Sequence, residues 1–163
     1  SFVNTHGISA VITRCSNNYG PNQFPEKLIP LMTLNAISGK SLPIYGDGQQ
    51  IRDWIHVEDH CSALFEVLIR GQSGRIYNVG GRSERSNLDV VRTVLEIVGK
   101  SESLITFVED RKGHDWRYAI DNTRIQSELN WEPKHSFEEG LMETVQWYIE
   151  NLDWSMNLTK SGH

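Results

Sequence analysis

Seven polar side chains stand at the ends of predicted strands and helices, where an α/β fold presents groups to a ligand. A guanidinium recognises phosphate oxygens with paired hydrogen bonds, each charge-assisted bond contributing roughly 1.5–3 kcal/mol. Carboxamides donate to the same oxygens, and a tyrosine ring can stack on a base. We interpret the set as a candidate site for a phosphorylated ligand: Asn17, Lys27, Tyr45, Arg52, Asn87, Arg111 and His114.

Spacing alone is equally compatible with a structural role for each of these residues. Asn87 can be a helix N-cap, Arg52 a solvated strand arginine and Lys27 a helix-surface charge. Both interpretations stay open at this level.

His56 and His60 have the i, i+4 spacing of a metal-binding pair, with Asp59 and Cys61 close by. Closed zinc sites usually show a second pair of ligands, which the sequence lacks. We therefore interpret the pair as capping groups at a strand-to-helix junction and predict no metal site. His6, His135 and His163 carry no signal, and Glu138 and Glu139 suit the first turn of a helix.

The glycines exclude one function for this chain on its own. No Gly-x-Gly-x-x-Gly follows the first predicted strand, so the usual cradle for a dinucleotide is absent. Gly39-Lys40-Ser41 and Gly99-Lys100-Ser101 resemble P-loop ends, but the earlier glycine is replaced by Leu34 and Val94. Both are expected to be helix C-caps. No nicotinamide cofactor is expected to bind this chain alone.

The composition is that of a globular domain. A chain of 163 residues with 38% hydrophobic residues can bury one core, and its net charge of −5 argues against nucleic-acid binding. Cys15 and Cys61 give no disulfide framework, and no apolar run reaches membrane-spanning length. We expect a cytoplasmic protein with no membrane partner.

Hydrophobic periodicity predicts alternating strands and helices. Strands are expected at 8–13, 42–45, 51–57, 76–79 and 104–108, and the pair 42–45 and 51–57 as a small hairpin or looped connection. Helices are expected at 25–39, 57–70, 88–98, 121–129 and 137–148, with a closing turn before Gly7. The expected buried faces comprise Leu28, Met32 and Ala36; Val57, Cys61, Leu64 and Leu68; Leu88, Val91, Leu95 and Val98; and Phe137, Leu141, Val145 and Tyr148.

Several stretches are similar to one enzyme family. They are Arg14-Cys-Ser-Asn-Asn-Tyr-Gly-Pro21, Phe24-Pro-Glu-Lys-Leu-Ile-Pro30, Pro43-Ile-Tyr-Gly46, Gln50-Ile-Arg-Asp-Trp54, Tyr77-Asn-Val-Gly-Gly81, Asn87-Leu-Asp-Val90 and Gly113-His-Asp-x-Arg-Tyr-Ala-Ile-Asp121. Together they resemble dTDP-glucose 4,6-dehydratases, extended members of the short-chain dehydrogenase/reductase superfamily. Related sugar-nucleotide epimerases share only the shorter pieces.

The resemblance implies an α/β fold: part of a Rossmann-type short-chain dehydrogenase, mainly its smaller C-terminal substrate-binding domain. Residues 1–154 would form the nucleotide-sugar-binding region, with 1–20 left from the cofactor sheet, and 155–163 a polar, frayed tail. The glycine-rich turn, the Tyr-x-x-x-Lys pair and the Asp-Glu acid/base pair of the family would lie upstream of Ser1. No catalytic residue is assigned here.

The resemblance also assigns roles. Asn17, Arg52 and Asn87 would contact the pyrophosphate of a dTDP-sugar. The segment 27–32, which begins with Lys27 and Leu28, and the segment of Pro43, Ile44 and Tyr45 would form the wall around the nucleoside. Arg111 and His114 would lie in a closing loop, residues 110–114. Asn18 and Cys15 would face the nicotinamide of NAD in the intact enzyme.

Three hypotheses remain open: an inactive part of a dehydratase, a free-standing nucleotide-sugar-binding module, and a folded remnant that self-associates. Because strand 8–13 would normally belong to a larger sheet, we expect a homo-oligomer or a segment-swapped dimer.

Overall fold

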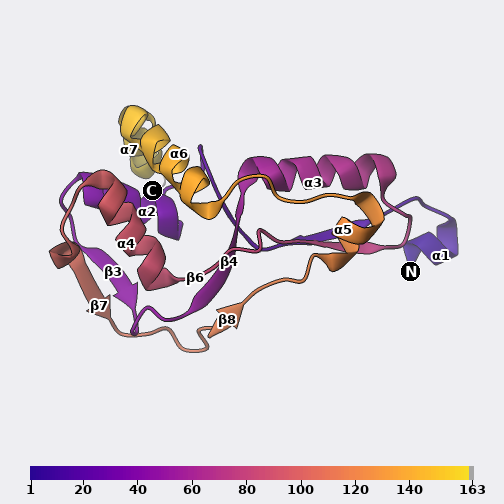
Figure 1. Cartoon of the computed structure of the whole chain (residues 1–163), viewed down its shortest axis with the longest axis horizontal. Helices are drawn as coiled ribbons and strands as arrows, with labels where there is room; N and C mark the ends of the chain where they lie inside the picture. The colour runs from indigo at the N-terminus through magenta and orange to yellow at the C-terminus, as the bar shows by residue number, and fades with distance from the viewer. Residues whose placement is uncertain (162–163) are drawn as a thin grey trace.

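The computed structural model describes residues 1–161. It divides into two lobes joined by β4 (Ile51–His56), as Figure 1 shows. The sheet lobe, on the right, holds α1, α3, α5 and the β1–β5 pair; the cleft lobe, on the left, holds α2, α4, α6, α7 and the β3–β7 pair. Each lobe has its own hydrophobic cluster.

The helices from α1 to α6 follow the predicted order, whereas η1 and α7 were not predicted. The helices are α1 Phe2–His6, α2 Leu28–Ile37, α3 Val57–Arg70, α4 Asn87–Val98, the 3-10 turn η1 Glu102–Leu104, α5 Thr123–Leu129, α6 Phe137–Glu150 and α7 Leu152–Ser161. The remaining strands are β1 Ile12–Cys15, β2 Asn17–Tyr19, β3 Leu42–Tyr45, β5 Ile76–Val79, β6 Glu84–Ser86, β7 Ile105–Val108 and β8 Arg117–Tyr118.

Strand pairing contradicts the expected hairpin between residues 42–45 and 51–57. β3 pairs in parallel with β7, whereas β4 pairs with β2, β6 and β8. The Gly46 amide donates to Val108 O of β7 at 2.9 Å and so continues the β3–β7 pairing beyond Tyr45. The turn after β3 therefore does not bring β4 back alongside β3. Parallel strands need a long crossover connection, so β7, the partner of β3, lies far along the chain and could not be predicted from the spacing of nearby residues.

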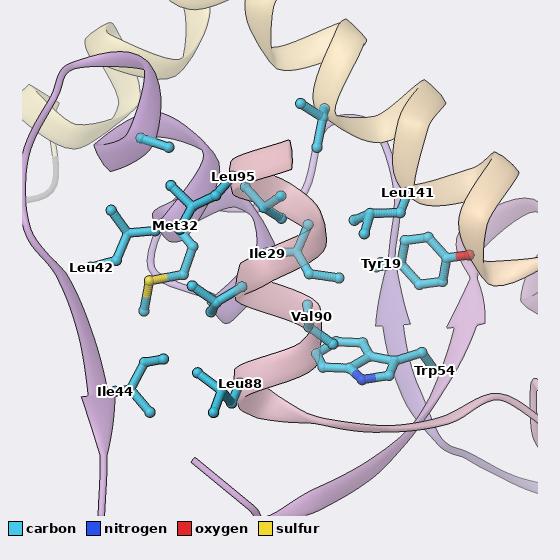
Figure 2. Close-up of a cluster of buried hydrophobic side chains, with 14 of the residues drawn as sticks. Tyr19, Ile29, Met32, Leu42, Ile44, Trp54, Leu88, Val90, Leu95 and Leu141 are labelled. Carbon is cyan, nitrogen blue, oxygen red and sulfur yellow. The ribbon is translucent and has the colours of Figure 1, made fainter. Parts of the chain in front are cut away.

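The cleft lobe packs α4 against α2 and α6, as Figure 2 shows. Leu88, Val91 and Leu95 are buried as predicted, and Val98 is partly buried. Met32 and Ala36 of α2 are also buried, but this helix begins at Leu28 and not at Pro25. The predicted buried face of α6 is confirmed at Phe137, Leu141, Val145 and Tyr148.

Helix α3 buries a different face from the one predicted. Ala63 and Val67 pack into the sheet lobe, whereas Cys61 and Leu64 are exposed and Leu68 is 77% exposed. The apolar stripe was recognised correctly as helical, but a single helix can carry two apolar faces. Only its packing on β4 and β5 decides which one is buried.

Three local predictions need correction. The first strand begins at Ile12 and is half-buried where residues 8–13 were expected to be buried. The cap of α4 is Ser86, whose hydroxyl accepts from the Asp89 amide, so Asn87 is the first helical residue. The expected polar tail is helical through Ser161, and Ser155 is fully buried; Gly162 and His163 lie outside the described residues.

The predicted cap of α6 is confirmed, because Ser136 Oγ accepts from the Glu139 amide at 3.2 Å. At the start of α5 the N-cap is Asn122 and not the predicted Asp121, although Asp121 Oδ1 accepts from the Thr123 amide at 2.8 Å. Gly7 and Gly99 close α1 and α4 in the left-handed conformation, which an L side chain rarely adopts.

We predict that Leu141→Ala lowers the free energy of unfolding by about 2–5 kcal/mol, because it leaves a cavity in the centre of the cleft lobe. Leu141 is fully buried, whereas its neighbour Met142 is 53% exposed. Met142→Ala is therefore the control and should change stability by less than about 0.5 kcal/mol. Urea unfolding of both variants checks this, and equal losses would contradict the packing described.

Candidate functional site

The main cleft has a volume of about 430 Å³ and lies in the cleft lobe. All ten residues expected to contact a nucleotide-sugar line it: Asn17, Lys27, Leu28, Pro43, Ile44, Tyr45, Arg52, Asn87, Arg111 and His114. The structure thus brings together side chains that the sequence separates by almost 100 positions.

Sheet register places the polar floor of the cleft. Asn17 of β2 lies opposite Trp54 of β4, and Ser86 of β6 lies opposite Ile51. Arg52 therefore occupies the strand between Asn17 and the start of α4, where Asn87 follows directly after β6. Two carboxamides and a guanidinium converge on one point as a result.

Four further lining residues were not predicted as site residues: Glu26, Leu31, Met32 and Trp54. Leu31 and Met32 belong to a segment that the resemblance had already indicated as nucleoside wall. Trp54 is more informative, because its indole N–H is buried without a hydrogen-bond partner in the described structure. The Trp54 side chain therefore lines the cleft while its N–H is covered by other protein atoms.

The charged side chains of the cleft favour an anionic ligand, although the net charge of the whole chain is negative. Lys27 is paired with Glu26 at 2.7 Å on the exposed rim. Arg52 donates through Nη1 to the carbonyl of Ile51 at 2.7 Å and takes part in no ion pair among the described residues. Its remaining donors are therefore available for phosphate-like oxygens.

The loop after β7 forms one wall through a chain of contacts. The Arg111 guanidinium lies 5.1 Å above the centre of the Tyr45 ring and donates to His114 Nε2 at 3.1 Å. His114 Nδ1 donates to Asp110 Oδ1 at 2.7 Å, and Gln50 donates to the other carboxylate oxygen at 3.0 Å. This arrangement defines the tautomer of His114 and holds Arg111 over Tyr45.

Cys15 and Asn18, expected to face a nicotinamide, lie together but outside the main cleft. The Asn18 amide donates to Ser16 O at 3.1 Å and to Cys15 Sγ at 3.4 Å. Its oxygen lies 2.8 Å from Nδ1 of His60, a contact not predicted from the sequence. Burial lowers the pKa of His60, so a neutral ring donates to Asn18 and orients the amide.

The histidine predictions are corrected in two places. His56 precedes α3, but its side chain makes no capping hydrogen bond, and both ring nitrogens are buried with no partner among the described side chains. His135 was assigned to a surface-like position; its ring instead packs 4.2 Å from that of His56. The i, i+4 partner His60 bonds to Asn18.

No helix in the described part of the chain is long and apolar enough to cross a membrane.

The fold and the cleft together define an α/β protein of the extended short-chain dehydrogenase type. Residues 1–144 match the family described as GDP-mannose 4,6 dehydratase, and the chain belongs to that family.

Relatives within this family are closely similar. A dTDP-glucose 4,6-dehydratase from Shigella flexneri is 54% identical over 97% of this chain and 45% of its own length. The crystal structure of a dTDP-glucose 4,6-dehydratase from Bacillus anthracis in complex with NAD has a TM-score of 0.92 and 52% identity, covering 96% of this chain and 50% of that one.

DesIV, a dTDP-glucose 4,6-dehydratase from Streptomyces venezuelae crystallised with NAD and a dTDP-type ligand, has a TM-score of 0.94 and 46% identity. It covers 96% of this chain, which corresponds to 49% of DesIV. The chain thus spans about half the length of the relatives it matches.

The contact with His114 makes a testable pKa prediction. The His114 hydrogen bond, reinforced by the Arg111 amide, lowers the pKa of Asp110 below its ordinary value. The folded state therefore favours the carboxylate; this preference is present above the ordinary pKa and is lost as pH falls through the lowered one. In carbon NMR titrations, His114→Ala should raise the Asp110 pKa, whereas His135→Ala, outside the cleft, should leave it unchanged. No rise in His114→Ala would contradict the geometry.

Proposed function

We propose that this chain is the nucleotide-sugar-binding, C-terminal part of a dTDP-glucose 4,6-dehydratase and is inactive alone. The observation that carries the proposal is the convergence of ten separately predicted residues on one cleft. The high identity to dTDP-glucose 4,6-dehydratases supports the assignment of the class. The order of family motifs implied by the resemblance supports the C-terminal position.

Phosphate recognition is assigned to Asn17, Arg52 and Asn87. Arg52 has guanidinium donors left after its bond to Ile51 O, and the carboxamides flank it on β2 and α4. A diphosphate supplies several acceptor oxygens within the reach of all three groups.

The nucleoside is assigned to the wall made by α2 and β3, with Tyr45 beside the base. The Tyr45 ring is 45% exposed and already carries the Arg111 guanidinium on one side. A flat aromatic face next to an arginine plane suits a stacked base. The closing loop would then hold the nucleotide through Arg111 and His114.

The reaction needs groups that this chain does not provide. In the intact family enzyme NAD would take a hydride from the sugar and return it after water is eliminated. This chain contains no Gly-x-Gly-x-x-Gly, so its own residues do not fit the cofactor's pyrophosphate. Its part is to bind and orient the sugar nucleotide, with Asn18 and Cys15 turned toward the nicotinamide.

We predict that Arg52→Ala weakens dTDP binding by at least about 1.5 kcal/mol, roughly tenfold, because charged hydrogen bonds to phosphate are lost. Isothermal titration calorimetry of the chain with dTDP, and in parallel with UDP, measures this. Arg70→Ala is the matched control, since Arg70 pairs with Glu66 at the end of α3 and does not line the cleft.

The outcomes separate the hypotheses. Saturable binding that prefers dTDP and is weakened only by Arg52→Ala supports a preformed site and a free-standing binding module. No binding at millimolar dTDP means that the site is incomplete without a second half. An unchanged affinity in Arg52→Ala returns this arginine to the solvated-surface interpretation.

Self-association is the second part of the proposal. The exposed face of α3 carries Leu64, Phe65, Leu68 and Ile69, of which Phe65 is 62% and Leu68 77% exposed. Among the described strands β1 pairs only with β5, which leaves its other edge open. Exposed apolar surface and an open strand edge both favour association with a second copy.

We predict concentration-dependent association in sedimentation velocity, weakened at least about tenfold by Leu68→Glu. Met142→Glu places the same charge on an exposed apolar position of α6 and should leave association unchanged. A monomer at high concentration, or equal effects of both variants, would contradict the role of the α3 face.

A further inference from the structure

A second group of potential ligand atoms lies at the junction of β4, α3 and α6. It comprises His56 at the end of β4, His135 in the segment before α6 and Glu143 in α6. One nitrogen or oxygen from each lies within 4.8 Å of the other two. None of the three lines the main cleft, so this group is separate from the nucleotide-sugar site.

His56 has the most unusual environment of the three. Its side chain is buried with 3% exposure, and neither ring nitrogen has a hydrogen-bond partner within the part of the chain that the structure describes. The ring packs closely against two glycines: a Cβ added at Gly140 would lie 3.2 Å from His56 Cδ2, and a Cβ added at Gly20 would lie 3.4 Å from Nε2. Leaving a buried polar group unpaired costs about 1–3 kcal/mol, so the ring is expected to have a partner that is not a protein group.

His135 is surrounded by carboxylates. Its main-chain amide donates to Asp59 Oδ2 at 3.0 Å, and its Nδ1 lies 3.1 Å from the same oxygen, close but poorly aligned for a hydrogen bond. Its Nε2 lies 3.6 Å from Glu58 Oε2. Asp59 is itself buried. A carboxylate beside the non-ligating nitrogen is the usual second-shell support of a metal-binding histidine.

We propose that His56, His135 and Glu143 form a binding site for a divalent transition-metal ion of the zinc class. Two imidazoles and a carboxylate suit zinc, cobalt or nickel better than calcium or magnesium, which prefer all-oxygen sites. Water would complete a tetrahedral shell, and Asp59 would orient His135. The bound ion would join β4 and the start of α3 to α6.

The three ligand atoms, which lie within 4.8 Å of one another, must move closer together to bind one ion. A tetrahedral ion with bonds of about 2.0–2.1 Å holds its ligand atoms about 3.3 Å apart. Glu143 is exposed and can rotate inward, which also leaves the ion a path from solvent.

The alternative is a metal-free pair of stacked imidazoles beside an unrelated glutamate. Only the proposed metal site predicts saturable binding of zinc or cobalt to this chain. The test is titration of the chelator-treated chain with zinc by calorimetry and with cobalt by visible absorption. A bound cobalt ion with nitrogen and oxygen ligands gives ligand-field bands and no thiolate charge-transfer band.

Variants identify the ligands. Glu143→Gln and His135→Asn should each weaken zinc binding about tenfold or more. Glu150→Gln changes another exposed acid two turns along α6, and Cys61→Ser removes an exposed thiol; both should bind as the parent does. Binding that is absent, that survives both ligand variants, or that disappears in Cys61→Ser would overturn the proposal.

A fold control keeps the result interpretable. Because Glu143 is exposed, Glu143→Gln should retain the melting temperature of the metal-free parent. Zinc should then raise the melting temperature of the parent and of Glu150→Gln more than that of Glu143→Gln, because an ion that binds only the folded state stabilises it in proportion to its affinity. Equal shifts in all three would assign the effect to other groups and reject the site.

Discussion

The buried carboxylate of Asp53 holds the two lobes in their relative positions. It accepts hydrogen bonds from the amides of Gly81 and Ser83 at 3.1 and 2.7 Å, and thereby fastens the turn after β5 onto β4. A Cβ at Gly81 would overlap the carbonyl of Trp54, so only glycine allows this approach. Charged hydrogen bonds of this kind contribute roughly 1.5–3 kcal/mol each. Arg52, the start of β6 and hence Asn87 take their places from this contact.

Alternation along the paired strands separates two surfaces. On β4, Arg52 and Trp54 line the cleft, whereas Asp53 between them points to the Gly81 turn. On β2, Asn17 lines the cleft, whereas the next residue, Asn18, bonds to His60 on the other side. A single parallel register thus directs the proposed phosphate contacts to one face and the proposed nicotinamide-facing amide to the other. A slip of one residue would exchange these roles.

Helices were predictable from the sequence where the pattern that specifies them lies within the helix and its caps. Helix α4 was recognised from Leu88, Val91 and Leu95 and from Gly99, because periodicity and a left-handed cap act within a few residues. Three features could not be predicted in this way: the pairing of β3 with β7, the buried face of α3 and the environment of His135. Each depends on a partner far along the chain: β7 for β3, the sheet lobe for α3, and His56 with Asp59 for His135.

The amino-acid sequence alone was enough to predict the order and type of the longer helices and strands, the absence of a dinucleotide turn and, through the resemblance, the identity of ten cleft residues, but not β2, β6, β8 or α7. It did so because side-chain chemistry, capping and hydrophobic period are properties of short segments. Tertiary contacts set which of these residues meet, that Arg111 lies over Tyr45, and that His56 is buried beside His135 with no hydrogen-bond partner among the described residues. Those outcomes depend on sheet register and on burial, which are set by contacts between distant segments.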